Sequence, residues 1–182
     1  MKKTALLIID VQNFYFNEDQ SRLYEPEKTS AQIAKVLNYF RKTKQTVIHV
    51  KHVDRNSAFY KPNDSSIDIH ESVAPIEGEI IIEKAHPNAF LDTSLYDTLK
   101  KLEIKNLVIV GMMSHMCVDT TVRSASDHGF QVTVLDDCCT TKELTFRDTT
   151  IDAVQVHKAF MASFEGFFGH VCNTEEYFMD KD

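Results

Sequence analysis

The sequence lacks an excess of positive charge and a long hydrophobic run. Its 182 residues include 20 basic and 27 acidic residues, and the net charge of −7 has the wrong sign for a protein that neutralises nucleic-acid phosphates. The apolar run near the N-terminus extends only from Ala5 to Ile9, which is too short for a signal-peptide core or a membrane span. We therefore expect a cytoplasmic protein with no nucleic-acid partner and no membrane partner.

Cysteine is scarce, and the sequence contains no CxxC pair. The four cysteines are Cys117, Cys138, Cys139 and Cys172, and the adjacency of Cys138 and Cys139 disfavours a disulfide between them. Reduced thiols are therefore expected. With 43% hydrophobic residues, the chain is long enough for one substantial core and short for two, so we predict a single domain over residues 1–182.

Apolar segments rich in Ile and Val alternate with helical patterns along the chain. Their near-continuous apolarity indicates strands buried on both faces, as in a parallel sheet, and the βα alternation predicts an open, doubly wound α/β domain. The predicted strands are residues 5–10, 46–50, 80–84, 107–111, 131–135 and 170–173. The predicted helices cover residues 33–40, 94–102, 118–125 and 151–164. Ser94 and Asp97 resemble a capping box at the start of the second helix, and Gly129 is the expected C-cap after the third.

Three other segments have distinctive composition. Residues 54–75 and 136–150 are polar without sustained periodicity, and we interpret them as functional loops or oligomer contacts. Residues 154–168 carry more Phe than one helix on a sheet requires. We expect part of this last segment to be buried between subunits of a homodimer or homotetramer.

Reactive side chains lie at the ends of two predicted strands and just after a third. Ligands of open α/β sheets bind outside the carboxyl ends of the strands, where Asp10, Lys84 and Cys117 are expected to converge. Each has an ordinary alternative as a turn residue, a solvated lysine or a buried, inert thiol. With Ser114 as N-cap, Cys117 would lie in the first helical turn, where N–H groups favour a thiolate and could bind an oxyanion. Asp10 is then the candidate base, tuned by Lys84.

Ordered motifs over nearly the whole chain resemble one known family. The segments LLIIDVQNFYF, GEIIIEKAHPNAFLDTSL and LVIVGMMSHMCVDTTVRSASDHGFQVTVLDDC are similar to those of the isochorismatase-like cysteine hydrolases. The resemblance implies a three-layer α/β/α fold with a six-stranded parallel sheet and an Asp10, Lys84 and Cys117 triad. It also implies a cis peptide between Met112 and Met113, which aims the Met113 N–H, with that of Cys117, at an oxyanion.

The sequence departs from two branches of that family. Nicotinamidases carry a metal-binding Asp-Trp-His run, whereas this chain has no Trp and reads His52-Val53-Asp54, with His70 farther on. His52, Asp54 and His70 could still bind a metal, but such histidines more often form hydrogen bonds, so we expect no metal and no other cofactor and doubt nicotinamidase activity. The isochorismatases proper lack the nucleophilic cysteine, so Cys117 argues against isochorismate as substrate.

We predict hydrolysis of a small molecule at a non-peptide C–N bond of amide or ureido type, through a thioester on Cys117. An apolar pocket is expected around this thiol, with His86 as a weaker candidate than His115. The expected lining residues are Phe14, Phe16, Phe90, Met112, Met113, His115 and Met116.

Two other functions are compatible with the sequence. One is a non-catalytic protein of the same fold that binds a small ligand, which the presence of all three reactive residues disfavours. The other is a thiol-based redox protein in which Cys138 or Cys139 resolves an oxidised Cys117, although burial of the adjacent pair is the simpler interpretation.

Overall fold

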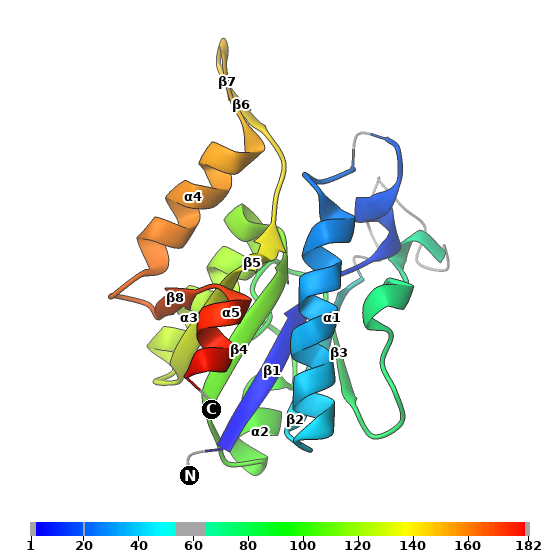
Figure 1. The fold of residues 1–182 in the computed structure, drawn as a ribbon, viewed down its shortest axis with the longest axis vertical. Helices are drawn as coiled ribbons and strands as arrows, with labels where there is room; N and C mark the ends of the chain where they lie inside the picture. The colour runs from blue at the N-terminus through cyan, green and yellow to red at the C-terminus, as the bar shows by residue number, and fades with distance from the viewer. Residues whose placement is uncertain (1–2, 20, 54–64, 181–182) are drawn as a thin grey trace.

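A six-stranded parallel sheet carries the fold (Figure 1). The computed structural model describes residues 3–19, 21–53 and 65–180. The strand order is β3-β2-β1-β4-β5-β8, and every neighbouring pair is parallel. The six predicted strands are therefore confirmed, with shifted ends. Their bounds are β1 (Lys3–Ile9), β2 (Thr46–His52), β3 (Ile80–Lys84), β4 (Ile104–Met112), β5 (Gln131–Thr140) and β8 (His170–Cys172).

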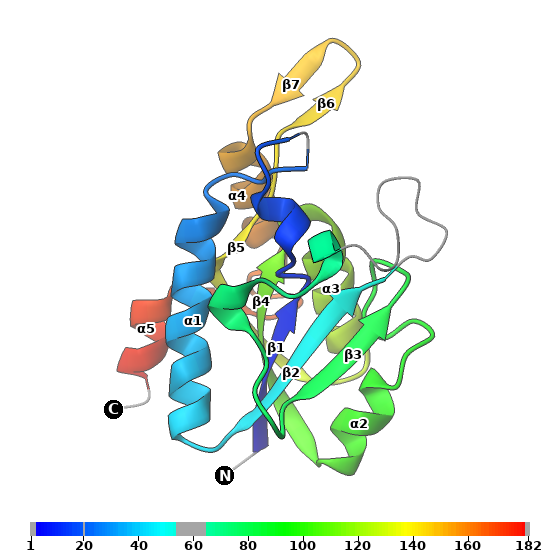
Figure 2. The ribbon, with the colours of Figure 1, turned by 90° about the vertical axis from the view of Figure 1, so that its right-hand side faces the viewer.

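Helices cover both faces of this sheet. Figure 2 shows α1 (Pro26–Lys42) and α5 (Thr174–Met179) on one side of the sheet, and α2 (Leu95–Lys101) and α3 (Asp119–Asp127) on the other. The remaining α-helix among the described residues, α4 (Ala153–Phe164), buries Met161 and Phe164 in the same core as α2 and α3. The expected three-layer α/β/α architecture is confirmed.

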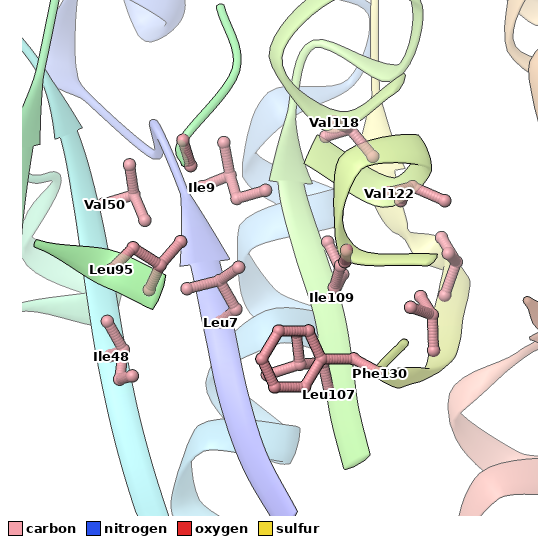
Figure 3. Close-up of a cluster of buried hydrophobic side chains, with 14 of the residues drawn as sticks. Leu7, Ile9, Ile48, Val50, Leu95, Leu107, Ile109, Val118, Val122 and Phe130 are labelled. Atoms are coloured by element: carbon pink, nitrogen blue, oxygen red, sulfur yellow. The ribbon is translucent and has the colours of Figure 1, made fainter. Parts of the chain in front are cut away.

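Strand β1 separates two hydrophobic cores because its side chains alternate between the faces of the sheet. Leu7 and Ile9 face α2 and α3, whereas Leu6 and Ile8 face α1. In Figure 3 Leu7 and Ile9 lie among side chains from β2, β4 and the two helices of that layer. Full burial of one such side chain contributes roughly 1.5–3 kcal/mol, so the centre of the sheet is strongly held.

The four predicted helices are present with shifted ends, and the structure differs from the prediction in one cap and in one further helix. Ser94 is the N-cap residue of α2, but its side chain makes no cap hydrogen bond, and the Leu95 N–H donates to Thr93 Oγ1 instead. The sequence prediction also missed α5, although Asn173 and Glu176 form a full capping box there. This short helix of six residues has too few apolar positions to give a periodic signal.

The prediction of a polar loop over residues 136–150 is wrong in part. Strand β5 continues to Thr140, and the antiparallel strands β6 (Leu144–Phe146) and β7 (Thr149–Ile151) form a hairpin that projects beyond the sheet (Figures 1 and 2). Half of the other predicted loop, residues 54–64, lies outside the described residues, and the other half, residues 65–75, contains two short 3-10 turns. Among the described helices, none combines the length and the apolarity needed to cross a membrane.

Candidate active site

The ends of three strands bring Asp10, Lys84 and Cys117 together, as the strand-end argument predicts. Asp10 follows β1, Lys84 ends β3, and Cys117 lies in the turn after β4. Lys84 Nζ donates to Asp10 Oδ2 at 2.6 Å and to Cys117 Sγ at 3.3 Å. The exposed fractions of the three residues are 0%, 3% and 5%, so an acid, an ammonium and a thiol meet in a nearly dry environment.

The backbone of Asp10 adopts an unusual conformation. Its φ of 50° lies in the left-handed region, where aspartate is among the more tolerated residues, and its N–H donates to the Val50 carbonyl at 3.0 Å. Such backbone strain is concentrated at functional sites. Oδ1 of the buried carboxylate has no hydrogen-bond partner among the residues that the structure describes. The carboxylate therefore retains one oxygen that could accept a proton from the thiol or from a substrate.

Strand β4 approaches β1 closely just before the thiol turn. A Cβ on Gly111, whose φ is 128°, would lie 2.0 Å from the Ile9 carbonyl oxygen, so this position requires glycine. The Met112–Met113 peptide that follows is cis, as the family resemblance implies. The chain then enters a π-helical turn over Ser114–Val118 that leads directly into α3.

This π turn presents Cys117 at the sheet edge. The Met113 carbonyl accepts the N–H groups of Met116 at 3.0 Å and Val118 at 3.2 Å, on either side of the Cys117 N–H. The sequence had suggested Ser114 as the N-cap, but the N-cap is Met113 and Ser114 lies inside the turn. Ser114 Oγ is 2.8 Å from His157 Nδ1 of α4. Single π turns occur frequently at functional sites.

The electrostatic environment keeps the free thiol protonated. Burial raises the pKa of Cys117, and the Asp10 carboxylate raises it further, while Lys84 opposes both effects. Burial lowers the pKa of Lys84, but the charges of Asp10 and Cys117 outweigh this effect and raise it, so the side chain stays an ammonium. The sequence had suggested that N–H groups at the helix start would favour a thiolate, whereas burial acts in the opposite direction. The thiol needs a base at the moment of attack.

A fourth residue lies at the site, His52 at the end of β2, which the sequence analysis considered only as a possible metal ligand. Its Nδ1 lies 3.2 Å from Lys84 Nζ. Gln12 fixes the same strand end: its side chain accepts the His52 N–H at 2.8 Å and donates to the His52 carbonyl at 3.0 Å and the Ile67 carbonyl at 2.6 Å. The glutamine of the D-x-Q motif was the available signal, since a buried amide must find backbone partners.

The three residues considered as metal ligands are not shown together. His70 stacks on Phe16 with ring centroids 3.7 Å apart, and its Nδ1 is 2.8 Å from Ser72 Oγ. Asp54 lies outside the described residues. Within the described part of the chain, no group of three or more His, Cys, Asp or Glu side chains could hold a metal ion. That the protein needs no metal remains a prediction.

Two of the predicted pocket residues are buried in the hydrophobic cores, on opposite faces of the sheet. Met112 has no exposed surface and packs among the side chains between the sheet and α1. Phe90 packs on His128 and Phe130, with ring centroids 5.0 and 6.1 Å away, and belongs to the same buried core as Cys117; its contact with substrate remains a prediction. Methionine and phenylalanine fill cores as readily as pockets, so residue type alone could not separate the two roles.

The other predicted lining residues lie nearer the sheet edge. Phe14 and Phe16 belong to a 3-10 turn after β1 and are partly buried, Met113 is 9% exposed, and Met116 is 40% exposed. His115 Nδ1 forms a hydrogen bond with Thr141 Oγ1, and burial lowers the pKa of this histidine. Direct substrate contact by these residues remains a prediction.

A cavity of about 370 Å³ opens beside Lys84. Among the described residues its lining includes neither Asp10 nor Cys117, so the apolar pocket around the thiol remains a prediction. The lining includes His86, which the sequence analysis ranked second. The lining residues are Val53, Glu83, Lys84, Ala85, His86 and Asp92.

Comparison with known proteins identifies one family along nearly the whole chain. The isochorismatase domain matches residues 4–176. The chain is 44% identical over 176 residues to the uncharacterized isochorismatase family protein YddQ of Bacillus subtilis strain 168, covering 96% of this chain and 98% of that protein. The crystal structure of an isochorismatase from Pseudomonas putida KT2440 matches with a TM-score of 0.91 at 36% identity, over 97% of this chain and 91% of the other.

Two further relatives have names that state a reaction. Ureidoacrylate amidohydrolase RutB of Acinetobacter baylyi is 29% identical over 110 residues, which cover 60% of this chain and 41% of that protein. Nicotinamidase 3 of Arabidopsis thaliana is 25% identical over 174 residues, covering 87% of this chain and 82% of that protein.

Proposed function

Because the chain belongs to the isochorismatase family of hydrolases, we propose that it hydrolyses a carbon–nitrogen bond, other than a peptide bond, in a small molecule. The observation that carries the proposal is the buried contact of Lys84 with both Asp10 and Cys117, beside a carboxylate oxygen without a partner among the described residues. The amide and ureido chemistry in the names of two relatives supports the same class of bond.

The first half of the reaction forms a thioester. As Cys117 Sγ attacks the carbonyl carbon of an amide or ureido group, its proton passes to Asp10, so no free thiolate has to accumulate in the buried site. The developing oxyanion accepts hydrogen bonds from the N–H groups of Met113 and Cys117. Asp10 then gives the proton to the leaving nitrogen as the C–N bond breaks.

The second half regenerates the thiol. Water attacks the thioester carbon, losing a proton to Asp10, and the collapse of this intermediate releases a carboxylic or carbamic acid and returns the proton to the sulfur. Throughout, the Lys84 ammonium compensates whichever of Asp10 and Cys117 carries the negative charge. A buried cation is effective in this role because the low local dielectric strengthens the attraction.

Redox chemistry fits the structure less well. Cys138 and Cys139 pack into opposite cores, on the α1 face and the α3 face of the sheet, and both are buried. Burial raises the pKa of Cys138 and raises that of Cys139 to about 12, so neither is poised as a resolving thiolate. This observation favours hydrolysis over the thiol-based alternative.

A screen for released ammonia or amine tests the proposal. Primary amides, ureido acids and N-carbamoyl amines would be incubated with the wild-type protein, with Cys117→Ser and with Cys172→Ser as the matched control. We expect turnover from the wild type and the control, and a loss on the order of 10³-fold or more in Cys117→Ser while it stays folded. Equal rates in Cys117→Ser and the wild type would remove the thiol from the mechanism.

A further inference from the structure

The Lys84 ammonium has three hydrogen-bond acceptors. They are Asp10 Oδ2 at 2.6 Å, His52 Nδ1 at 3.2 Å and Cys117 Sγ at 3.3 Å. An ammonium carries three N–H donors, so each donor has one acceptor. We propose that His52 is a positioning residue: its Nδ1 lone pair fixes one N–H of Lys84 and thereby aims the other two at Asp10 and Cys117.

The sheet itself places His52 for this role. His52 and Lys84 are register partners in the parallel pair of β2 and β3, so their side chains leave the sheet on the same face. Beyond this pair, the Val53 N–H donates to the Lys84 carbonyl at 2.8 Å. The two strands therefore stay joined at the level of the site, and the backbone that carries the imidazole is fixed beside Lys84.

Gln12 fixes the same strand end from the side of β1. It is fully buried, and its amide group bonds both the N–H and the carbonyl of His52. Gln12 comes two residues after Asp10, so one short segment supplies the proposed base and anchors the strand that carries His52. The position of the ammonium is thus set by β1, β2 and β3 together.

The contact requires one form of the imidazole. Nδ1 can accept from the ammonium only when it carries no proton, which assigns the neutral ring with its proton on Nε2. An imidazolium would place a second cation 3.2 Å from Lys84 Nζ in a buried site, where like charges repel strongly. The tautomer is therefore an observable consequence of the proposed role.

Nuclear magnetic resonance of the wild-type protein tests the tautomer directly. Two-bond ¹H–¹⁵N correlations on protein labelled with ¹⁵N-histidine distinguish a protonated ring nitrogen from one with a free lone pair, and His52→Asn assigns the signal. At neutral pH we expect Nδ1 of His52 to be unprotonated and its resonance to shift in Asp10→Asn/Lys84→Met, which removes the donor. A proton on Nδ1, or an unchanged resonance in the double variant, would overturn the proposal.

Two substitutions test the effect on the thiol. His52→Asn retains an oxygen acceptor near the position of Nδ1, whereas His52→Leu keeps the bulk and removes the acceptor. The readout is the rate of iodoacetamide labelling of Cys117 between about pH 6 and 10, measured by peptide mass spectrometry. We expect His52→Leu to move the profile to higher pH and to slow labelling roughly fivefold, the equivalent of one lost hydrogen bond. His52→Asn should stay within about twofold of wild type.

His70→Leu is the matched control, because its ring stacks on Phe16 and bonds Ser72. A purely structural effect would affect His52→Asn and His52→Leu alike, and either that result or wild-type profiles in both would contradict the positioning role. The catalytic meaning of the contact rests on the proposed hydrolase function, but neither readout requires turnover. A protein that hydrolyses none of the screened amides yet shows the expected tautomer and labelling would refute only the proposed function.

Discussion

Lys84 Nζ and Asp10 Oδ2 lie 2.6 Å apart, and both side chains are fully removed from solvent. The two residues are 74 positions apart in the chain and reach each other across β2. A buried pair of this kind stabilises little compared with well-packed apolar residues, but an isolated partner is costly. The contact is therefore better explained by what it does to Cys117 than by stability.

The cost of isolating one partner leads to the first prediction. Lys84→Met leaves the Asp10 carboxylate buried without its counter-ion and should lower the free energy of unfolding by about 3–5 kcal/mol. Asp10→Asn/Lys84→Met removes both charges and should recover most of that loss. Urea denaturation followed by circular dichroism measures both. A double variant as unstable as Lys84→Met would show that the pair itself, not the unpaired charge, matters.

The second prediction concerns the reactivity of Cys117. Because its pKa is raised by burial and by Asp10, iodoacetamide should label it slowly at pH 7 and faster only well above the range of an ordinary thiol. Asp10→Asn removes a neighbouring negative charge, so labelling at a given pH should rise, on the order of tenfold. The same variant should lose turnover. Slower labelling in Asp10→Asn would contradict this account of the thiol.

Glu79 supports a third prediction, on pH and stability. Its carboxylate bonds Arg41 Nε at 2.7 Å and His49 Nε2 at 2.9 Å, and its side chain is 8% exposed. Burial raises the pKa of Glu79, but Arg41, the Ile76 N–H and His49 outweigh it and lower the value from 4.5 to about 2.

A depressed carboxylate pKa stabilises the folded state above the unfolded pKa, and this contribution is lost as the pH falls from about 4.5 towards 2. At pH 6, the free energy of unfolding of Glu79→Gln should therefore lie roughly 1–3 kcal/mol below that of the wild type. Between pH 6 and pH 3 the wild type should lose stability, whereas Glu79→Gln should lose little more, so the difference between them should narrow. Urea midpoints at both pH values measure the difference, with exposed Glu77→Gln as control. Parallel losses in wild type and Glu79→Gln would refute the assignment.

The fourth prediction compares two glycines with positive φ. Gly111→Ala places a Cβ 2.0 Å from the Ile9 carbonyl oxygen, whereas Gly129→Ala meets nothing within 4 Å. Gly129→Ala should cost about 1–2 kcal/mol, the price of the left-handed conformation alone. Gly111→Ala should cost clearly more and also slow labelling of Cys117, since β4 would have to move. Thermal unfolding of both variants decides, and equal losses would show that the close approach relaxes freely.

The fifth prediction is that the protein self-associates through the segment 154–168. Phe167 in this segment is 83% exposed, which is unusual for so large an apolar side chain. Light scattering should give a dimeric or tetrameric mass, and Phe167→Ser should weaken the assembly. Phe146→Ser, on the hairpin and outside the segment, is the matched control. A monomeric mass for the wild type would contradict the prediction.

Much of the architecture was predictable because burial leaves a direct record in the sequence. The apolar runs of β1 and β4 indicate strands covered on both faces, and in a parallel sheet their carboxyl ends share one edge. That rule alone places Asp10, Lys84 and Cys117 together. It requires no knowledge of side-chain positions, since topology sets the meeting point.

What could not be predicted depends on tertiary contacts between residues far apart in sequence. The role of His52 depends on its register with Lys84, and the protonation state of Cys117 depends on how deeply the turn is buried. Met112 was assigned to the pocket although it packs on the opposite face of the sheet from Cys117, which residue type and position in the sequence could not reveal. The β6–β7 hairpin was missed because each of its strands has only three residues, too few to show an alternating pattern.

The strand order β3-β2-β1-β4 has a consequence for how the site comes into existence. Asp10, Lys84 and Cys117 come from segments whose pairing closes long loops, and the first three strands hold Asp10, His52 and Lys84 without the thiol. The complete site should therefore form only when β4 joins β1, and a chain in which β3 has detached should leave Cys117 without its contact to Lys84. The reactivity of Cys117 should therefore depend on whether β3 is paired in the sheet. Its alkylation under increasing denaturant would report the opening of β3 separately from global unfolding.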